Sequence, residues 1–238
     1  MTRFAIATFL VSFSYFLKAQ GQDAALWAGM EFDKTIVKKV TAHVKLQGRL
    51  NDNFSHADYG FIDIGLSYKL NDYVRFTSAY VMNTKNSTLG NNWRLRQQWY
   101  GNVRFGYKWD NFSISNRNQL QTDLEDSRSS AGSWFYRNKT VVKYKLSESW
   151  QPYVSYEMYF RLGFRPMHEG LIYRSRYSLG VEYSFSKNTS LQMGYLLQTQ
   201  LKRKQPDEIY ALTLGFNHSF PGKLIDPKRK KKVKYRKY

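Results

Sequence analysis

The sequence predicts an all-β protein, an antiparallel transmembrane up-and-down β-barrel of about 10–12 strands. Three observations predict it: apolar and polar residues alternate with a period of two, an apolar leader precedes them, and short and long connections alternate between the strands. The 17% of aromatic residues suits strands. A mean hydropathy of −0.61 excludes a bundle of membrane helices.

The leader has the order of a secretory signal peptide. Arg3 supplies a positive charge, an apolar and small-residue run follows from Phe4 to Leu17, and Ala19 offers a small residue for cleavage. The run is about 14 residues, shorter than the ~20 that a membrane-spanning helix needs. We therefore expect a cleaved signal peptide at residues 1–19, a barrel domain at 20–220 and a basic, disordered periplasmic tail at 221–238.

The alternation is cleanest at residues 40–50. Apolar side chains there occupy every second position, and polar or charged ones such as His43, Lys45 and Arg49 occupy the positions between. A strand separates two such sets onto opposite faces, whereas a helix mixes them. The same pattern recurs at residues 62–69, 74–82, 95–107, 154–162, 176–185, 191–198 and 210–217.

The connections predict the orientation and complicate the strand count. Turn-forming residues stand at 33–34, 71–72, 110–111, 147–149 and 187–188, and longer polar stretches lie at 51–57, 84–92, 125–132, 165–169 and 203–207. Outer-membrane barrels place long loops outside and short turns in the periplasm. Eleven strand-like segments are present. Because bacterial single-chain barrels have even counts, we expect ten strands from Thr35 to Phe220 to close with both ends in the periplasm.

Ala24–Asp33 is then the odd segment. It pairs at the seam, lies in the lumen, or belongs to a twelve-stranded barrel, and the sequence leaves these alternatives open.

Several features favour a membrane barrel over a soluble secreted barrel that binds an apolar ligand inside. Aromatic residues stand near strand ends on the apolar face, where the girdles of a membrane barrel belong; they are Tyr68, Tyr107, Tyr144, Tyr183 and Phe185. The last strand ends in Phe220, which resembles the terminal signal read by the barrel assembly machinery. Outer-membrane lipid, lipopolysaccharide and that machinery are therefore the expected partners.

Several stretches together resemble a Bacteroidetes outer-membrane family, the domain of unknown function numbered 2490. They are Ala19-Gln20, Trp27, the segment PYVSYEMYF from Pro152 to Phe160, the segment RYSLGVEY from Arg176 to Tyr183, and Gly194-Tyr195. The resemblance covers roughly residues 22–220 and implies an outer-membrane barrel without implying an activity. The basic tail beyond Phe220 departs from the family's usual ending at the last strand.

The polar face of the predicted strands is rich in cations. They are Arg94, Arg96, Arg104, Arg117, Arg137, Lys139, Lys143, Arg161, Arg174 and Arg176, against Asp63, Glu157 and Glu182 as the chief acids. One interpretation is an anion-selective pore or an anion-binding cavity. The other is structural pairing across a narrow lumen, in which Glu157 and Glu182 each bind nearby arginines. The predicted function is a non-enzymatic outer-membrane barrel, structural or a narrow pore with a cation-rich lumen.

A barrel enzyme acting on lipid or lipopolysaccharide is the alternative. It needs a nucleophile and a base, and His43, His56, His168 and His218 are the four histidines of the chain. No nucleophile-elbow, zinc-protease, P-loop or dinucleotide motif is present, so no catalytic residue, metal or cofactor is predicted. The chain contains no Cys.

The tail carries much of the formal charge of +19. Its densest run is Lys228, Arg229, Lys230, Lys231 and Lys232. Such a run binds either nucleic acid or anionic headgroups, and an exported protein meets headgroups rather than nucleic acid. We expect contact with an anionic lipid surface, with a solvated disordered tail as the alternative.

Overall fold

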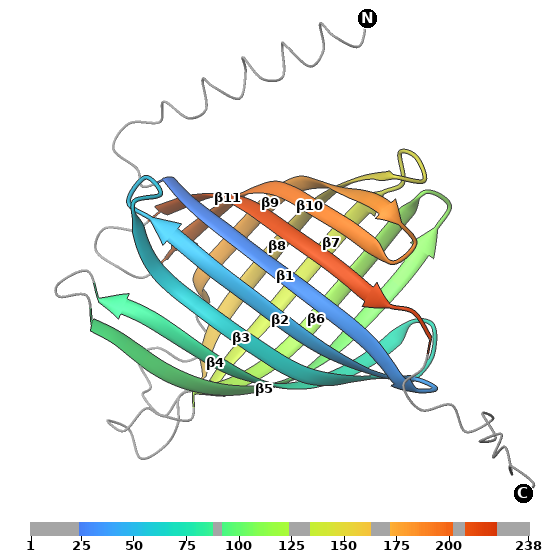
Figure 1. Cartoon of the computed structure of the whole chain (residues 1–238), viewed down its shortest axis with the longest axis horizontal. Helices are drawn as coiled ribbons and strands as arrows, with labels where there is room; N and C mark the ends of the chain where they lie inside the picture. The colour runs from blue at the N-terminus through green and yellow to red at the C-terminus, as the bar shows by residue number, and fades with distance from the viewer. Residues whose placement is uncertain (1–23, 88–91, 124–133, 163–171, 202–207, 223–238) are drawn as a thin grey trace, which may run out of the picture.

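Eleven strands close into one barrel (Figure 1). The computed structural model describes residues 24–87, 92–123, 134–162, 172–201 and 208–222, so the predicted signal peptide lies outside the described residues. The strands are β1 (Ala24–Val37), β2 (Val40–Asn51), β3 (His56–Lys69), β4 (Val74–Ser87), β5 (Asn92–Trp109), β6 (Phe112–Asp123), β7 (Trp134–Tyr144), β8 (Trp150–Leu162), β9 (Ile172–Ser186), β10 (Thr189–Gln200) and β11 (Glu208–Phe220).

The barrel closes through a parallel seam. Neighbouring strands pair antiparallel from β1 to β11, but β1 joins β11 in parallel, with Ala24 opposite Tyr210 and Lys34 opposite Phe220. An odd number of alternating strands forces this geometry, because the first and last strands must then run the same way. β1 therefore begins at the rim opposite to the one where β11 ends (Figure 1).

The expectation of ten closing strands with both ends at one rim is wrong. Three alternatives were open for Ala24–Asp33: pairing at the seam, a place in the lumen, or a twelve-stranded barrel. In the structure this segment pairs at the seam, with β11.

Four of the five expected tight turns are confirmed, since strands end and begin around 71–72, 110–111, 147–149 and 187–188. The expected turn at 33–34 is wrong. β1 continues through Asp33, which pairs with His43 of β2, and the chain reverses at Lys38 and Lys39, where Lys39 has a φ of 74°. Strand pairing with β2 on one side and β11 on the other outweighs the turn preference of an Asp-Lys pair.

Side-chain hydrogen bonds fix the two longer tight turns. The Asn71 side-chain oxygen accepts the backbone N–H groups of Tyr73 and Val74 at 2.9 and 2.8 Å. The Ser147 hydroxyl oxygen accepts the N–H of Trp150 at 3.1 Å. These residues replace the lost ladder hydrogen bonds where the chain reverses, which is why Asn and Ser stand there.

The wall of the barrel has its apolar face outside. Leu66 is 53% exposed, Val154 57% and Leu179 57%, while the buried residues include the polar or charged side chains of Asn83, Gln119 and Glu157. Among the described residues few apolar side chains are buried, and four of them, Ala25, Trp27, Leu196 and Ala211, form a small cluster beside the seam. A soluble barrel that holds an apolar ligand requires the opposite arrangement.

No stretch of helix in the described residues has the length and apolar character needed to cross a membrane.

Candidate functional site

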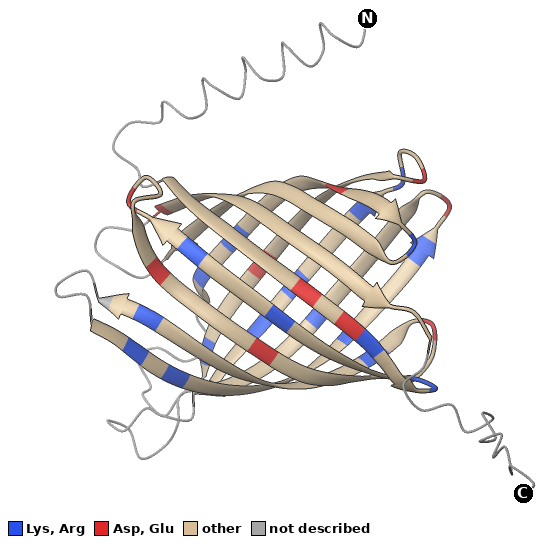
Figure 2. Cartoon of the chain, in the orientation of Figure 1, with Lys and Arg blue, Asp and Glu red and all other residues tan. Residues whose placement is uncertain are grey.

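The interior of the barrel holds a cavity of about 770 Å³, lined from all eleven strands. Its charged lining is strongly unbalanced: eleven cationic residues face four acidic ones. The cations are Lys45, Arg49, Lys85, Arg96, Arg104, Arg117, Arg137, Lys139, Lys143, Arg174 and Arg176, and the acids are Glu31, Asp58, Asp63 and Glu157. Figure 2 shows Lys and Arg spread around the wall, with Asp and Glu fewer.

Glu157 is the centre of the ion-pair network. It is only 4% exposed, and its carboxylate accepts hydrogen bonds from Arg117 at 2.6 Å and Arg137 at 2.8 Å. Arg176 lies 3.5 Å away, and the Tyr159 hydroxyl donates to the second carboxylate oxygen at 3.0 Å. One negative charge therefore neutralises part of three guanidinium groups. Such a buried carboxylate is stable only because these donors satisfy it.

Arginine side chains and aromatic rings contact one another near one rim of the barrel. We call it the long-connection rim, because the connections after β2, β4, β6, β8 and β10 lie there, and we call the other the short-turn rim. The Arg49 guanidinium carbon lies 4.0 Å from the centroid of Trp27 and 4.4 Å from that of Tyr59. The rings attract the guanidinium groups through their negative faces. We call this set the arginine–aromatic cluster: Trp27, Arg49, Tyr59, Arg137, Tyr159, Tyr173, Arg174 and Arg176.

Two arginines of this cluster have no acidic partner in the described part of the chain. Arg49 donates to the side-chain oxygen of Gln47 at 3.1 and 3.0 Å, which is a neutral acceptor. Arg174 faces the rings of Tyr159 and Tyr173 at 5.4 Å each, and its buried Nε has no hydrogen-bond partner. Their positive charge is offset only by polarisable rings and an amide. The cluster is thus an anion-deficient region of the lumen.

His43 and Asp63 form a buried pair in a different part of the lumen. Their Nε2 and Oδ1 atoms are 3.1 Å apart, and the Tyr100 hydroxyl donates to the other Asp63 oxygen at 2.9 Å. Gly65 leaves room for the imidazole, since a Cβ there would collide with the ring. In the described chain the hydrogen-bond partner of the His43 ring is Asp63, and no serine or threonine is hydrogen-bonded to it.

The other histidines are placed apart from this pair. His218 is bonded to the Thr189 hydroxyl at 2.9 Å, and His56 begins β3 at the long-connection rim. His168 lies outside the described residues.

The residues that the sequence singled out fall into four groups. Asp63, Arg96, Arg104, Arg117, Arg137, Lys139, Lys143, Glu157, Arg174 and Arg176 line the cavity. Arg94 and Arg161 are exposed near the long-connection ends of β5 and β8 and do not line it. Glu182 contacts Lys143 at 2.5 Å rather than an arginine. The tail residues Lys228 to Lys232 lie outside the described residues.

Sequence reasoning did not single out Lys45, Arg49 or Lys85 as lumen cations, nor the rings of Trp27 and Tyr59. Lys45 and Arg49 were already on the polar face of residues 40–50, so the signal was present. What the pattern cannot give is the convergence of Trp27, Arg49 and Tyr59, which depends on the register of β1, β2 and β3.

Within the described residues, no group of three or more His, Asp or Glu side chains is arranged to hold a metal ion.

The fold and the lining together define a closed β-barrel with an apolar exterior and a cation-rich interior. The chain belongs to the family described as protein of unknown function DUF2490, whose family model matches residues 24–209. Among solved structures it is similar to the NanC porin in a rhombohedral crystal form, with 9% identity and a TM-score of 0.47. That match covers 74% of this chain and 86% of the porin chain. Among curated protein sequences, none matches this chain.

Proposed function

We propose that this protein is a non-enzymatic β-barrel of the bacterial outer membrane whose lumen is a narrow, anion-selective pore. The observation that carries the proposal is the excess of eleven cations over four acids in the cavity lining. Rings of Arg and Lys select anions in pores because they lower the energy of a passing negative charge and raise that of a positive one.

The exterior supports a place in the membrane. Apolar side chains cover the outer face, and the short-turn rim carries paired aromatic rings, including Phe112 with Tyr144 at 4.9 Å and Trp150 with Tyr183 at 4.7 Å between centroids. Outer-membrane barrels have such a girdle at the headgroup level. The partners proposed on this basis are outer-membrane lipid and lipopolysaccharide, together with the barrel assembly machinery.

The ion pairs of the lumen do not use up its positive charge. Glu157 is shared by three arginines, whereas Arg49 and Arg174 have no acidic partner in the described chain. A closed wall of low dielectric strengthens the field of such groups above its strength in bulk water. The arginine–aromatic cluster is therefore the proposed selectivity region.

The test is ion selectivity of the purified full-length protein in planar bilayers under a potassium chloride gradient. The reversal potential is expected to have the sign of chloride preference. The double variant Arg49→Gln, Arg174→Gln removes the two arginines without acidic partners and is expected to move the reversal potential toward zero.

Lys187→Gln is the matched control, since it removes a cation from a tight turn outside the lumen. A cation-selective or unselective current in the unchanged protein contradicts the proposed pore, as does an equal shift in the control.

Membrane contact is tested separately by site-directed fluorescent labelling. Ile64→Cys places a label on the outer face, where Ile64 is 51% exposed, and Ser115→Cys places one on the cavity lining. A lipid-borne quencher is expected to quench the first label and spare the second. The reverse pattern, or recovery of the protein in the soluble periplasmic fraction, contradicts an outer-membrane barrel.

The basic tail is proposed to contact anionic lipid headgroups at the periplasmic rim, with each basic residue near the surface contributing ~1 kcal/mol.

A further inference from the structure

A polar cluster lies on the outer, apolar face of β6 and β7. On these strands Ser115, Arg117, Gln119, Arg137 and Lys139 line the cavity, so the residues between them point outward. Those outward residues are Asn116, Asn118, Asn138 and Thr140, which we call the outer amide cluster. Each is half-buried and stands in the middle of its strand. Lipid tails offer no hydrogen bonds to such groups, so mid-strand amides on this face need another partner.

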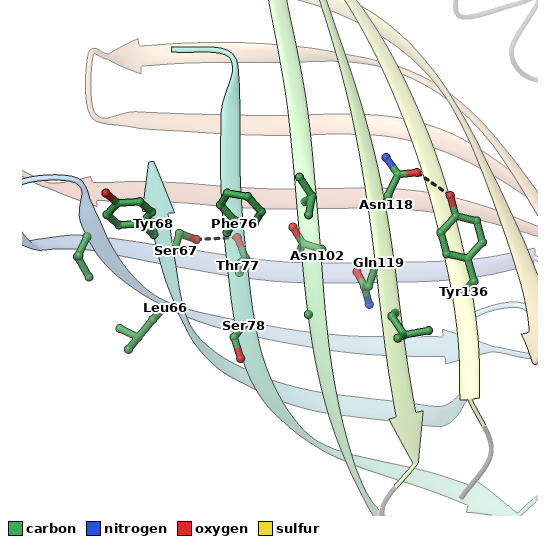
Figure 3. Close-up of a pocket in the computed structure, with 14 residues that line it drawn as sticks. Leu66, Ser67, Tyr68, Phe76, Thr77, Ser78, Asn102, Asn118, Gln119 and Tyr136 are labelled. Atoms are coloured by element: carbon green, nitrogen blue, oxygen red, sulfur yellow. Dashed lines mark hydrogen bonds between the residues drawn. The ribbon is translucent and has the colours of Figure 1, made fainter. Parts of the chain in front are cut away.

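The cluster forms an internal hydrogen-bond network. Asn116 donates to the Asn138 oxygen at 3.1 Å and to the Thr140 hydroxyl at 2.9 Å. Asn118 donates to Asn116 at 2.7 Å, and Asn138 donates to Asn118 at 2.8 Å. Tyr136 donates its hydroxyl to Asn118 at 2.6 Å (Figure 3).

Within the described residues this network leaves both hydrogen-bond donors and acceptors unused. Asn118 keeps one N–H, Thr140 keeps its hydroxyl hydrogen, and the Asn138 oxygen keeps one lone pair. A surface that offers both donors and acceptors can hydrogen-bond to a copy of itself, and a twofold interface requires such self-pairing.

A groove borders the cluster on the β4–β5 side. It measures about 680 Å³, and its lining includes Phe76, Ser78, Gly101, Asn118 and Tyr136 (Figure 3). Gly101 faces outward, and a Cβ built on it would meet only the Trp99 ring, at 3.5 Å. Small residues such as Gly and Ser permit close approach of protein surfaces inside a membrane.

A ridge borders the cluster on the β8–β9 side. The rings of Tyr156 and Tyr177 contact each other in a tilted arrangement with centroids 4.7 Å apart; Tyr177 is 52% exposed and Leu179 is 57% exposed. All copies of a membrane barrel are inserted in the same direction, so a twofold axis relating two of them must run along the membrane normal. Such an axis through β6 and β7 places the β4–β5 groove of each copy against the β8–β9 ridge of the other.

We infer that the protein forms a homodimer in the membrane, with the outer amide cluster at the twofold axis and groove meeting ridge on both sides. The inference rests on the membrane location proposed above, because in water a half-buried amide network needs no protein partner. It does not depend on ion selectivity, which is a property of the opposite face of the wall.

The chain lacks Cys, so a single introduced thiol reports without background. Asn138→Cys places that thiol near the proposed axis, where its twin in the second copy is close. Mild oxidation of the full-length protein in its native membrane is expected to give a disulfide-linked dimer. Leu46→Cys, which is 38% exposed on the outer face of β2, is the control and is expected to stay monomeric. Equal crosslinking at both positions, or none at Asn138→Cys, overturns the proposal.

A second pair of variants avoids the polar network. Gly101→Val fills the groove, and Gly48→Val adds the same atoms on β2, where an added Cβ has no neighbour within 4 Å. Gly101→Val is expected to abolish dimerisation measured by native mass spectrometry in detergent, whereas Gly48→Val is expected to retain it. Heat-modifiable gel migration checks that both barrels are folded.

Asn118→Leu removes the unused donor. It is expected to weaken the dimer about eightfold, as for two symmetry-related hydrogen bonds of the average strength found between membrane segments. A dimer that persists in Gly101→Val, together with an unchanged dimer affinity in Asn118→Leu, contradicts this interface. A monomer that is quenched by lipid at Ile64→Cys refutes the dimer and leaves the membrane barrel standing. Loss of that quenching refutes the barrel's membrane location instead.

Discussion

Glu157→Gln tests whether the lumen network holds the barrel together. The substitution keeps the size of the side chain and removes the one negative charge that Arg117, Arg137 and Arg176 share at 2.6, 2.8 and 3.5 Å. It also replaces one acceptor oxygen by an amide N–H₂, to which the guanidinium groups cannot hydrogen-bond because they only donate. Removing one partner of a buried ion pair typically costs 3–5 kcal/mol because the other charge stays buried without compensation.

The expected loss of unfolding free energy is at the lower end of that range, about 3 kcal/mol, because water reaches part of the network. The Arg117 and Arg137 side chains are 22% and 21% exposed, while that of Arg176 is 10% exposed. Urea unfolding of the full-length protein in detergent micelles, followed by tryptophan fluorescence, measures the change.

Glu31→Gln is the matched control. Its partner Lys45 lies 3.6 Å away, and the two side chains are 37% and 39% exposed, so a loss below about 1 kcal/mol is expected. If Glu157→Gln costs no more than Glu31→Gln, the argument that Glu157 organises the lumen is refuted. Added phosphate is expected to stabilise Glu157→Gln more than the unchanged protein, because it supplies the missing negative charge.

Three further outcomes are expected. Gly65→Ala should destabilise the barrel by about 1–3 kcal/mol in urea unfolding, since an added Cβ would collide with His43 and lie 2.7 Å from the Ser78 carbonyl oxygen; an unchanged midpoint would show that the wall relaxes there. Ala24→Cys should react with an impermeant thiol reagent on intact cells and Ser147→Cys should not, because β1 begins at the long-connection rim and Ser147 lies in a short turn; labelling from the same side would contradict the odd-stranded barrel. His43→Ala should leave phospholipid and lipid A profiles unchanged, because in the described residues its ring is hydrogen-bonded to Asp63 and to no serine or threonine; an altered profile would support the barrel enzyme.

The sequence alone determined the fold class and the two faces of the wall. Period two in residues 40–50 separated the outward Val44 and Leu46 from the inward His43 and Lys45, because side chains on a strand alternate strictly between faces. Turn residues such as Asn71 and Ser147 marked strand ends because their side chains bond the backbone locally. These features depend on neighbours along the chain, so they can be inferred from it.

The tertiary structure decided closure and every cross-strand site. The parallel seam between β1 and β11 depends on strands far apart in sequence. The even-count rule pointed to ten closing strands, whereas eleven close, within the predicted range of about 10–12. The arginine–aromatic cluster depends on the registers of all the strands that contribute to it. The outer amide cluster arises in the same way, because Asn118 of β6 stands opposite Asn138 of β7. Periodicity assigns a residue to a face, but only the pairing register decides which residues meet on that face.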